Sequence, residues 1–151
     1  MKVISNSRVT TALLFLGVVV NSGCLPSPGY YPLTPKFEGV VLRAGDPVAR
    51  TRVIVTDEHG DSLCDHELAE ATTNEAGKFA IAAVEEFQFV RLLFGDHLYR
   101  WHVCIDDGVS RVTAHVASSL GRVPPRIPLR CDLSAEASGG DGGFCDETDA
   151  L

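Results

Sequence analysis

Residues 71–81 read ATTNEAGKFAI, a stretch that holds a tight turn and the start of a strand. Gly77 can take the positive φ that such a turn needs, because it has no Cβ. Successive side chains of a strand point to opposite faces, so Phe79 and Ile81 lie on the same side. The stretch therefore predicts a turn at Gly77, followed by a strand whose apolar face covers a core.

Short β-rich runs bounded by turn residues continue on both sides of this stretch. The predicted strands cover 40–42, 52–56, 78–82, 87–93, 98–105, 112–117 and 127–131. One short helical turn is predicted around His66–Glu70, and no long helix is predicted. Seven or eight strands at this spacing predict an all-β fold, an antiparallel β-sandwich of the immunoglobulin-like kind.

Two blocks of the sequence resemble one known family. They are Gly39-Val40-Val41 with Asp46-Pro47-Val48 and Val53-Ile54-Val55, and residues 71–81. Together they look like the carboxypeptidase regulatory-like domain, a small transthyretin-like β-sandwich. In that family a G-x-V strand precedes a proline turn, a V-x-V strand follows, and T-x-x-x-G-x-F leads into the next strand. The resemblance covers about residues 37–82 and implies an accessory module without catalytic residues of its own.

One enzyme, the hydrolase of 5-hydroxyisourate, shares the wider transthyretin-like fold and carries a C-terminal Tyr-Arg-Gly-Ser signature. Here Tyr99-Arg100 is followed by Trp101-His102 and lies in the middle of the chain. Because of this departure the resemblance does not extend to that activity. The chain is predicted not to be an enzyme and to need no cofactor.

Residues 1–24 have the layout of an export signal. Lys2 and Arg8 precede an apolar run over 9–20, which is too short to span a bilayer, and small residues precede Cys24. The segment resembles the lipobox of bacterial lipoproteins, in which the cysteine thiol receives a diacylglycerol, although Asn21 stands where that family usually has Leu. The alternative is an ordinary secreted protein cleaved near Gly23.

The sequence predicts that the chain is divided into four segments. They are a lipoprotein signal peptide (1–23), a Pro-rich tether (24–35), the sandwich domain (36–131) and an acidic Gly-rich tail (132–151). The tether is expected to be extended, because proline fixes φ and removes amide donors. Leu25 follows the lipid site where some inner-membrane lipoproteins carry Asp, so the expected location is the outer membrane, facing the periplasm.

The charge of the chain excludes one class of partner. The net charge is −7, and loss of Lys2 and Arg8 with the signal makes it −9. An acidic chain without a basic stripe is not expected to bind nucleic acid.

The cysteine count supports both export and lipidation. Five cysteines leave one over, and assigning Cys24 to lipid leaves an even set for an oxidising compartment. Four thiols allow three pairings. Cys131–Cys145, which closes a Gly-rich loop, together with Cys64–Cys104 is the favoured hypothesis.

Few residues have a pattern that indicates chemistry. Asp65-His66-Glu67 lacks the second histidine that a zinc protease needs and is interpreted as a solvated loop. His97 and His102 fall on opposite faces of one strand, so they share no metal, although His115 from another strand could join either one. No metal site is predicted.

The strand over 98–105 is predicted to have a buried and an exposed face. Tyr99 and Trp101 share a face with Val103 and Ile105 and are interpreted as core. Arg100 and His102 on the other face form a possible interaction patch.

The tail holds six acidic residues and is expected to be disordered except where Cys145 fixes it. Its possible calcium ligands do not follow a known calcium-loop spacing, so any calcium binding is expected to be weak. These residues are Asp141, Asp146, Glu147 and Asp149.

The predicted function is that of a lipid-anchored cell-envelope protein whose non-catalytic sandwich binds a protein partner or supports an envelope assembly; no small-molecule substrate is expected. An alternative is a periplasmic inhibitor or immunity-type lipoprotein that neutralises a toxic enzyme, since an acidic surface steers a basic target. A third is a small His-dependent hydrolase, which requires histidines to meet a carboxylate in one pocket. The histidines are His66, His97, His102 and His115.

Lipidation is tested by metabolic labelling with palmitate in cells that express the full chain. The wild type is expected to take up label, and Cys24→Ser is expected to take up none, because the acceptor sulfur is lost. Equal labelling of the two proteins would contradict the assignment.

Overall fold

The computed structural model describes residues 28–57, 64–89, 97–134 and 143–148. The chain divides into two compact units, Tyr30–Glu86 with Gly95–Leu151, and Met1–Gly29 with Phe87–Phe94. Of the second unit, the structure describes only residues 28–29 and 87–89. The described residues form strands and no helix, which confirms the predicted all-β class.

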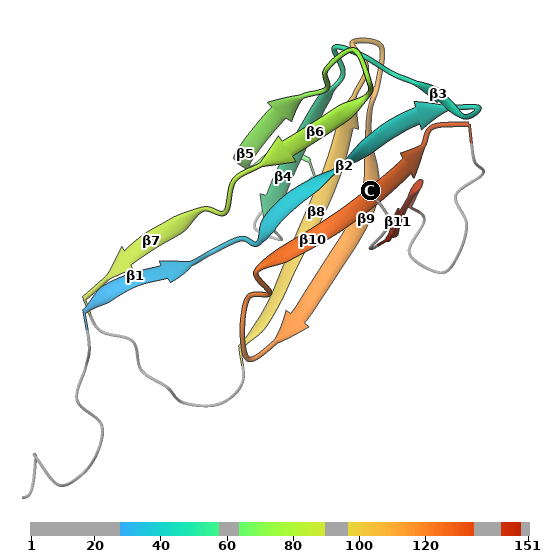
Figure 1. Cartoon of the computed structure of the whole chain (residues 1–151). Helices are drawn as coiled ribbons and strands as arrows, with labels where there is room; N and C mark the ends of the chain where they lie inside the picture. The colour runs from blue at the N-terminus through green and yellow to red at the C-terminus, as the bar shows by residue number, and fades with distance from the viewer. Residues whose placement is uncertain (1–27, 58–63, 90–96, 135–142, 149–151) are drawn as a thin grey trace, which may run out of the picture. The chain divides into compact units, whose positions relative to one another are not determined.

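Eleven strands appear in the described part of the chain (Figure 1). They are β1 (Gly29–Pro32), β2 (Lys36–Arg43), β3 (Asp46–Pro47), β4 (Arg52–Asp57), β5 (Glu67–Thr72), β6 (Lys78–Ile81), β7 (Glu85–Gln88), β8 (Leu98–Asp106), β9 (Arg111–Leu120), β10 (Arg126–Asp132) and β11 (Cys145–Glu147). Sheet I has the order β11-β10-β2-β3, with β6 also paired to β2, and sheet II has the order β5-β4-β8-β9. β1 pairs with β7.

One hydrophobic cluster takes its members from both larger sheets. Phe37, Phe79 and Leu129 of sheet I and Trp101 and Val103 of sheet II are each at most 5% exposed. The predicted core positions of Phe79, Trp101 and their strand neighbours Ile81, Val103 and Ile105 are confirmed. Burial of this apolar surface is the main favourable term that holds the two sheets together.

Sheet I differs from the predicted antiparallel pattern at its centre. β2 and β10 run parallel, with Phe37 opposite Ile127 and Gly39 opposite Leu129. The backbones meet closely there, since a Cβ on Gly39 would lie 2.2 Å from the Leu129 carbonyl oxygen. The antiparallel prediction was wrong for this pair, because alternation of side chains is the same in parallel and antiparallel strands and does not specify direction. The other pairs of sheets I and II are antiparallel, as predicted.

Gly77 takes the conformation that the sequence predicts. Its φ is 69°, and the turn before β6 is closed by a hydrogen bond from the Gly77 amide to the Asn74 carbonyl. A Cβ at this position would also lie 2.5 Å from the Val41 carbonyl oxygen. Both the backbone angle and the space therefore require glycine.

Three predicted secondary-structure features are corrected. The helical turn around His66–Glu70 is not formed, because residues 67–72 are strand β5, paired with β4. The strand predicted over 87–93 is instead β7, which ends at Gln88, and residues 90–96 lie outside the described residues. The count of seven or eight strands was too low, because β5 was taken for a helical turn and the short strands β1, β3 and β11 lack a distinct pattern.

The second half of the predicted tether is part of the fold. Residues 29–32 form β1, and Thr34 is fully buried. The Leu33 amide donates to the Val84 carbonyl at 2.7 Å, and the Val84 amide donates to the Thr34 hydroxyl at 3.0 Å. Prolines are compatible with an edge strand as well as with a linker, so composition did not distinguish the two.

Part of the predicted tail is also folded. Cys145 forms a disulfide with Cys131, as predicted, and β11 pairs antiparallel with β10. His115 of β9 contacts β11 twice, through Nδ1 to the Cys145 carbonyl oxygen and through Nε2 to Glu147, both at 3.2 Å. β11 therefore contacts both sheets. Residues 135–142 and 149–151 lie outside the described residues.

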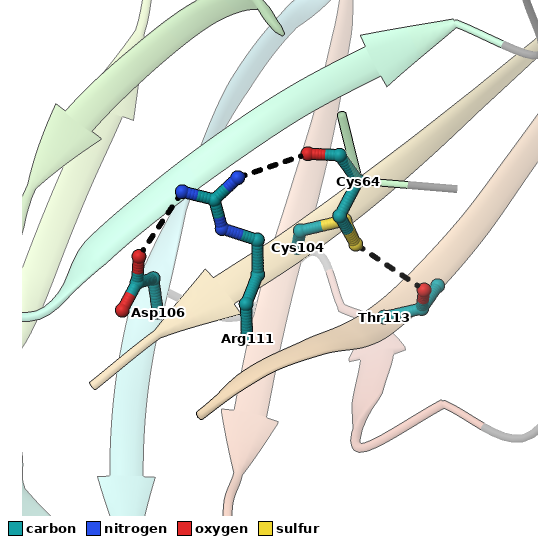
Figure 2. The surroundings of a disulfide bond; sticks show 5 residues. All are labelled: Cys64, Cys104, Asp106, Arg111 and Thr113. Atoms are coloured by element: carbon teal, nitrogen blue, oxygen red, sulfur yellow. Dashed lines mark hydrogen bonds and ion pairs between the residues drawn. A yellow bond between two sulfur atoms is a disulfide. The ribbon is translucent and has the colours of Figure 1, made fainter. Parts of the chain in front are cut away.

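The second disulfide joins Cys64 to Cys104, again as predicted. Figure 2 shows its surroundings on sheet II. The Arg111 guanidinium donates to the Cys64 carbonyl and to the Asp106 carboxylate, both at 3.2 Å, and the Cys64 sulfur lies 3.5 Å from the Thr113 hydroxyl. Cys64, Cys104 and Ile54 form a second small buried cluster. The disulfide thus fixes the segment before β5 against sheet II.

The close approach at Gly39 gives a stability prediction. Gly39→Ala is expected to lower the free energy of unfolding by about 3 kcal/mol, because the new methyl overlaps the Leu129 carbonyl and the parallel strands must separate. Ala80→Ser also adds one heavy atom to sheet I, at an exposed position, and is expected to cost less than about 0.5 kcal/mol. Denaturant unfolding measures both, and equal stabilities would contradict the close approach.

The two disulfides are expected to contribute different amounts to the free energy of unfolding. Replacing Cys64 and Cys104 by Ala removes a cross-link between residues 40 apart, and replacing Cys131 and Cys145 removes one between residues 14 apart. Chain entropy predicts losses of about 4 and about 3 kcal/mol, respectively. Urea unfolding of the two double variants tests the order, and unchanged stability in either would contradict that bridge.

Candidate functional site

A hollow of about 590 Å³ lies where sheet I borders strand β5. Its lining comes from β2, β5, β6, β10 and the turn before β6: Glu38, Gly39, Ala71, Thr72, Asn74, Lys78, Phe79, Ala80, Arg126 and Pro128. We call it the β5–β6 hollow. The register explains why these side chains meet, because Ala80 is opposite Glu38 across β6 and β2, and Pro128 is opposite Glu38 across β10 and β2.

The hollow has more basic than acidic side chains around it. Glu38 forms ion pairs with Lys36 and with Arg126, the latter at 3.2 Å. The hydrogen bond from Lys36, its charge and that of Arg126 lower the pKa of Glu38, so it is ionised at neutral pH. Lys78 adds a third cation at an exposed position of β6. Two cations therefore pair with one carboxylate, and a third lines the same hollow.

β5 borders the hollow with an open main-chain edge. In the sheets that the described residues form, β5 pairs only with β4. The Thr73 amide donates to the Thr51 carbonyl at 2.9 Å, so the next pair along, Arg52 and Thr72, is a non-hydrogen-bonded pair. The amide and carbonyl of Thr72 therefore point away from β4, and those of Glu70 follow by the same alternation.

The neighbouring edge of β6 is closed at Lys78. The Asn74 side-chain oxygen accepts hydrogen bonds from the amides of Ala76 and Lys78, both at 3.0 Å. The Asn74 amide donates to the Lys78 carbonyl at 2.9 Å. Asn74 thus satisfies the outward main-chain groups of Lys78, so β6 cannot accept a further strand at this position, whereas β5 keeps the outward groups of Glu70 and Thr72.

A second, smaller cavity of about 250 Å³ lies at the start of β8. Tyr99 stacks on Trp101 with ring centroids 5.8 Å apart, and His97 meets Tyr99 edge-on at 4.6 Å. The indole nitrogen of Trp101 donates to the Leu33 carbonyl at 2.8 Å. These rings continue the hydrophobic core to its end, in agreement with the core interpretation of Tyr99 and Trp101.

The predicted patch of Arg100 and His102 is wrong for one of its two members. Arg100 is exposed, but His102 is only 4% exposed. Its neighbours across the sheet are Thr56 and Val116, and Thr56 is fully buried. The sequence suggested one buried and one exposed face for β8, whereas both faces are buried along its middle.

The histidines considered as ligands do not gather. His66 is exposed just before β5, His97 is exposed beside Tyr99, and His115 contacts β11. The described residues contain no group of three or more His, Cys, Asp or Glu that could hold a metal ion. Of the suggested calcium ligands, Asp146 and Glu147 lie on β11, and Asp141 and Asp149 lie outside the described residues, as does Cys24.

The residues of the β5–β6 hollow were not singled out from sequence. Their signal is weak: charges at alternate positions of β2 and β10, with Lys78 after a glycine turn. Which strands are neighbours decides whether these charges meet, and that depends on the parallel pairing.

No protein-family model matches the sequence, and no curated protein matches it either. Among the described residues there is no helix long and apolar enough to cross a membrane.

Proposed function

We propose that this chain is a lipid-anchored cell-envelope protein whose β-sandwich, of transthyretin-like arrangement, binds a protein partner without catalysis. The signal-like segment ending at Cys24 supports the anchor. The shared core of two sheets and the glycine turn before β6 support the arrangement.

The observation that carries the binding role is the open edge of β5 beside the hollow. Exposed strand edges associate with other chains through main-chain hydrogen bonds, and side-chain pockets next to them give specificity. β5 offers the outward amides and carbonyls of Glu70 and Thr72, and the hollow starts at Ala71 and Thr72. The two features lie side by side, so one extended segment can use both.

The chemistry of the hollow favours recognition over turnover. Glu38 is held ionised by two cations, which suits a fixed charge pattern and not a group that exchanges protons near neutral pH. The opening is wide and lined by both charged and apolar side chains, as in surfaces that bind peptides.

Proline at Thr72 tests this role. Thr72→Pro removes the outward amide and keeps the bonds to β4, because Thr72 lies in a non-hydrogen-bonded pair. Capture of an envelope partner is expected to fall about tenfold, through one lost hydrogen bond and the bulk of the ring. Thr72→Ala keeps the amide and is the matched control, and both variants should unfold within about 1 kcal/mol of the wild type.

Equal capture by Thr72→Pro, Thr72→Ala and the wild type would contradict strand addition at β5. If the captured partner is a toxic enzyme and co-expression protects cells, the binding role is that of an immunity-type inhibitor. If the partner is a structural envelope protein, the role is one of assembly.

A further inference from the structure

We infer that the partner segment bound at the β5–β6 hollow is an extended strand with acidic residues at alternate positions. The inference rests on the proposed binding role of β5 and specifies the chemistry of the partner.

The exposed face of sheet I is cationic. Arg130 and Lys78 flank Val40 from the two sides of β2, and Arg126 is opposite Lys36. All four of these basic residues are exposed at their strand positions. Glu38 lies among them, and Asp146 is opposite Arg130 at the β11 edge. The described part of this face therefore carries more positive than negative charge.

This face is opposite in sign to the chain as a whole, whose net charge is −7. Charges on a protein surface are screened over about 8 Å at physiological salt. A segment bound in the hollow thus responds mainly to Lys36, Lys78, Arg126 and Glu38, because the acidic side chains of β5 itself, Glu67 and Glu70, are paired with Arg52. Local charge complementarity favours an acidic segment.

The geometry of an added strand explains why the acidic residues of the partner should occupy alternate positions. A strand hydrogen-bonded to β5 presents every second side chain to the hollow. Lys78 is opposite Val40 and Arg126 is opposite Lys36, so the two cations are four residues apart along β2, about 13 Å. Carboxylates four positions apart on the partner strand match this spacing, and both lie on the same face of that strand.

Glu38 argues for separate carboxylates and against a phosphate group. It lies between Lys36 and Arg126 and stays ionised, so a compact dianion placed there meets a like charge. Single carboxylates spaced along a strand can pair with Lys78 and Arg126 on either side of it. A peptide also supplies the main-chain groups that the β5 edge requires.

Synthetic peptides test the inference with the full mature chain. The probe is fluorescein-labelled Thr-Glu-Val-Glu-Thr-Glu-Val-Glu-Thr, and the matched peptide has Gln in place of every Glu. Binding is measured by fluorescence anisotropy at low and at physiological salt. The Glu peptide is expected to bind about fivefold more tightly than the Gln peptide at low salt, with a smaller ratio at higher salt.

Variants of residues in the hollow identify the side chains that cause the preference for the Glu peptide. Lys78→Gln is expected to weaken Glu-peptide binding about threefold, and Glu38→Gln to strengthen it about twofold, because the first removes a cation and the second a like charge. Arg43→Gln makes the same charge change at the far end of β2, where Arg43 pairs with Asp107, and is the control expected to bind as the wild type. Thr72→Pro is expected to weaken binding of both peptides more than Thr72→Ala does, because only the proline removes the outward amide.

Two outcomes separate failure of this inference from failure of the proposed function. Equal binding of the Glu and Gln peptides, both weakened by Thr72→Pro, would overturn the acidic specificity and leave the β5 edge as the binding site. Glu-selective binding that is unaffected by Thr72→Pro would overturn both strand addition and the alternate spacing. A peptide with its four Glu contiguous that binds as well as the alternating one would also overturn the spacing.

Discussion

The structure depends on the parallel contact between β2 and β10. β2 pairs with β10 on one side and with β3 and β6 on the other, so it organises all of sheet I except β11. The contact is possible because Gly39 allows the Leu129 carbonyl to approach its Cα closely. Phe37 and Val41 on β2 and Leu129 on β10 are then fully buried in the core shared with sheet II. A side chain at residue 39 would disturb both the ladder and the core.

The two disulfides reinforce different parts of this arrangement. Cys131–Cys145 brings β11 against β10, and His115 extends the contact of β11 to sheet II. Cys64–Cys104 fixes the start of the β5 segment, and Arg111 supports the same place through the Cys64 carbonyl. The disulfides therefore stabilise the edges of the domain, while apolar burial stabilises its centre.

The candidate binding surface follows from strand order. Parallel pairing puts Arg126 beside Lys36 and Pro128 beside Glu38, and antiparallel pairing puts Ala80 on the other side of Glu38. Asn74 closes the β6 edge at Lys78, while β5 keeps outward main-chain groups. A closed edge, an open edge and a cationic face together limit where and how an extended segment can be added.

The sequence by itself determined the local features of the protein. Alternating side chains predicted most strands, the freedom of glycine predicted the turn at Gly77, and cysteine spacing favoured the disulfides that are present. Tertiary structure decided strand direction, the strand character of residues 67–72 and the burial of His102. It also brought Glu38, Lys78 and Arg126 together at the hollow. The reason is physical: alternation and turns depend on neighbours in the chain, whereas pairing and burial depend on contacts between residues far apart in sequence.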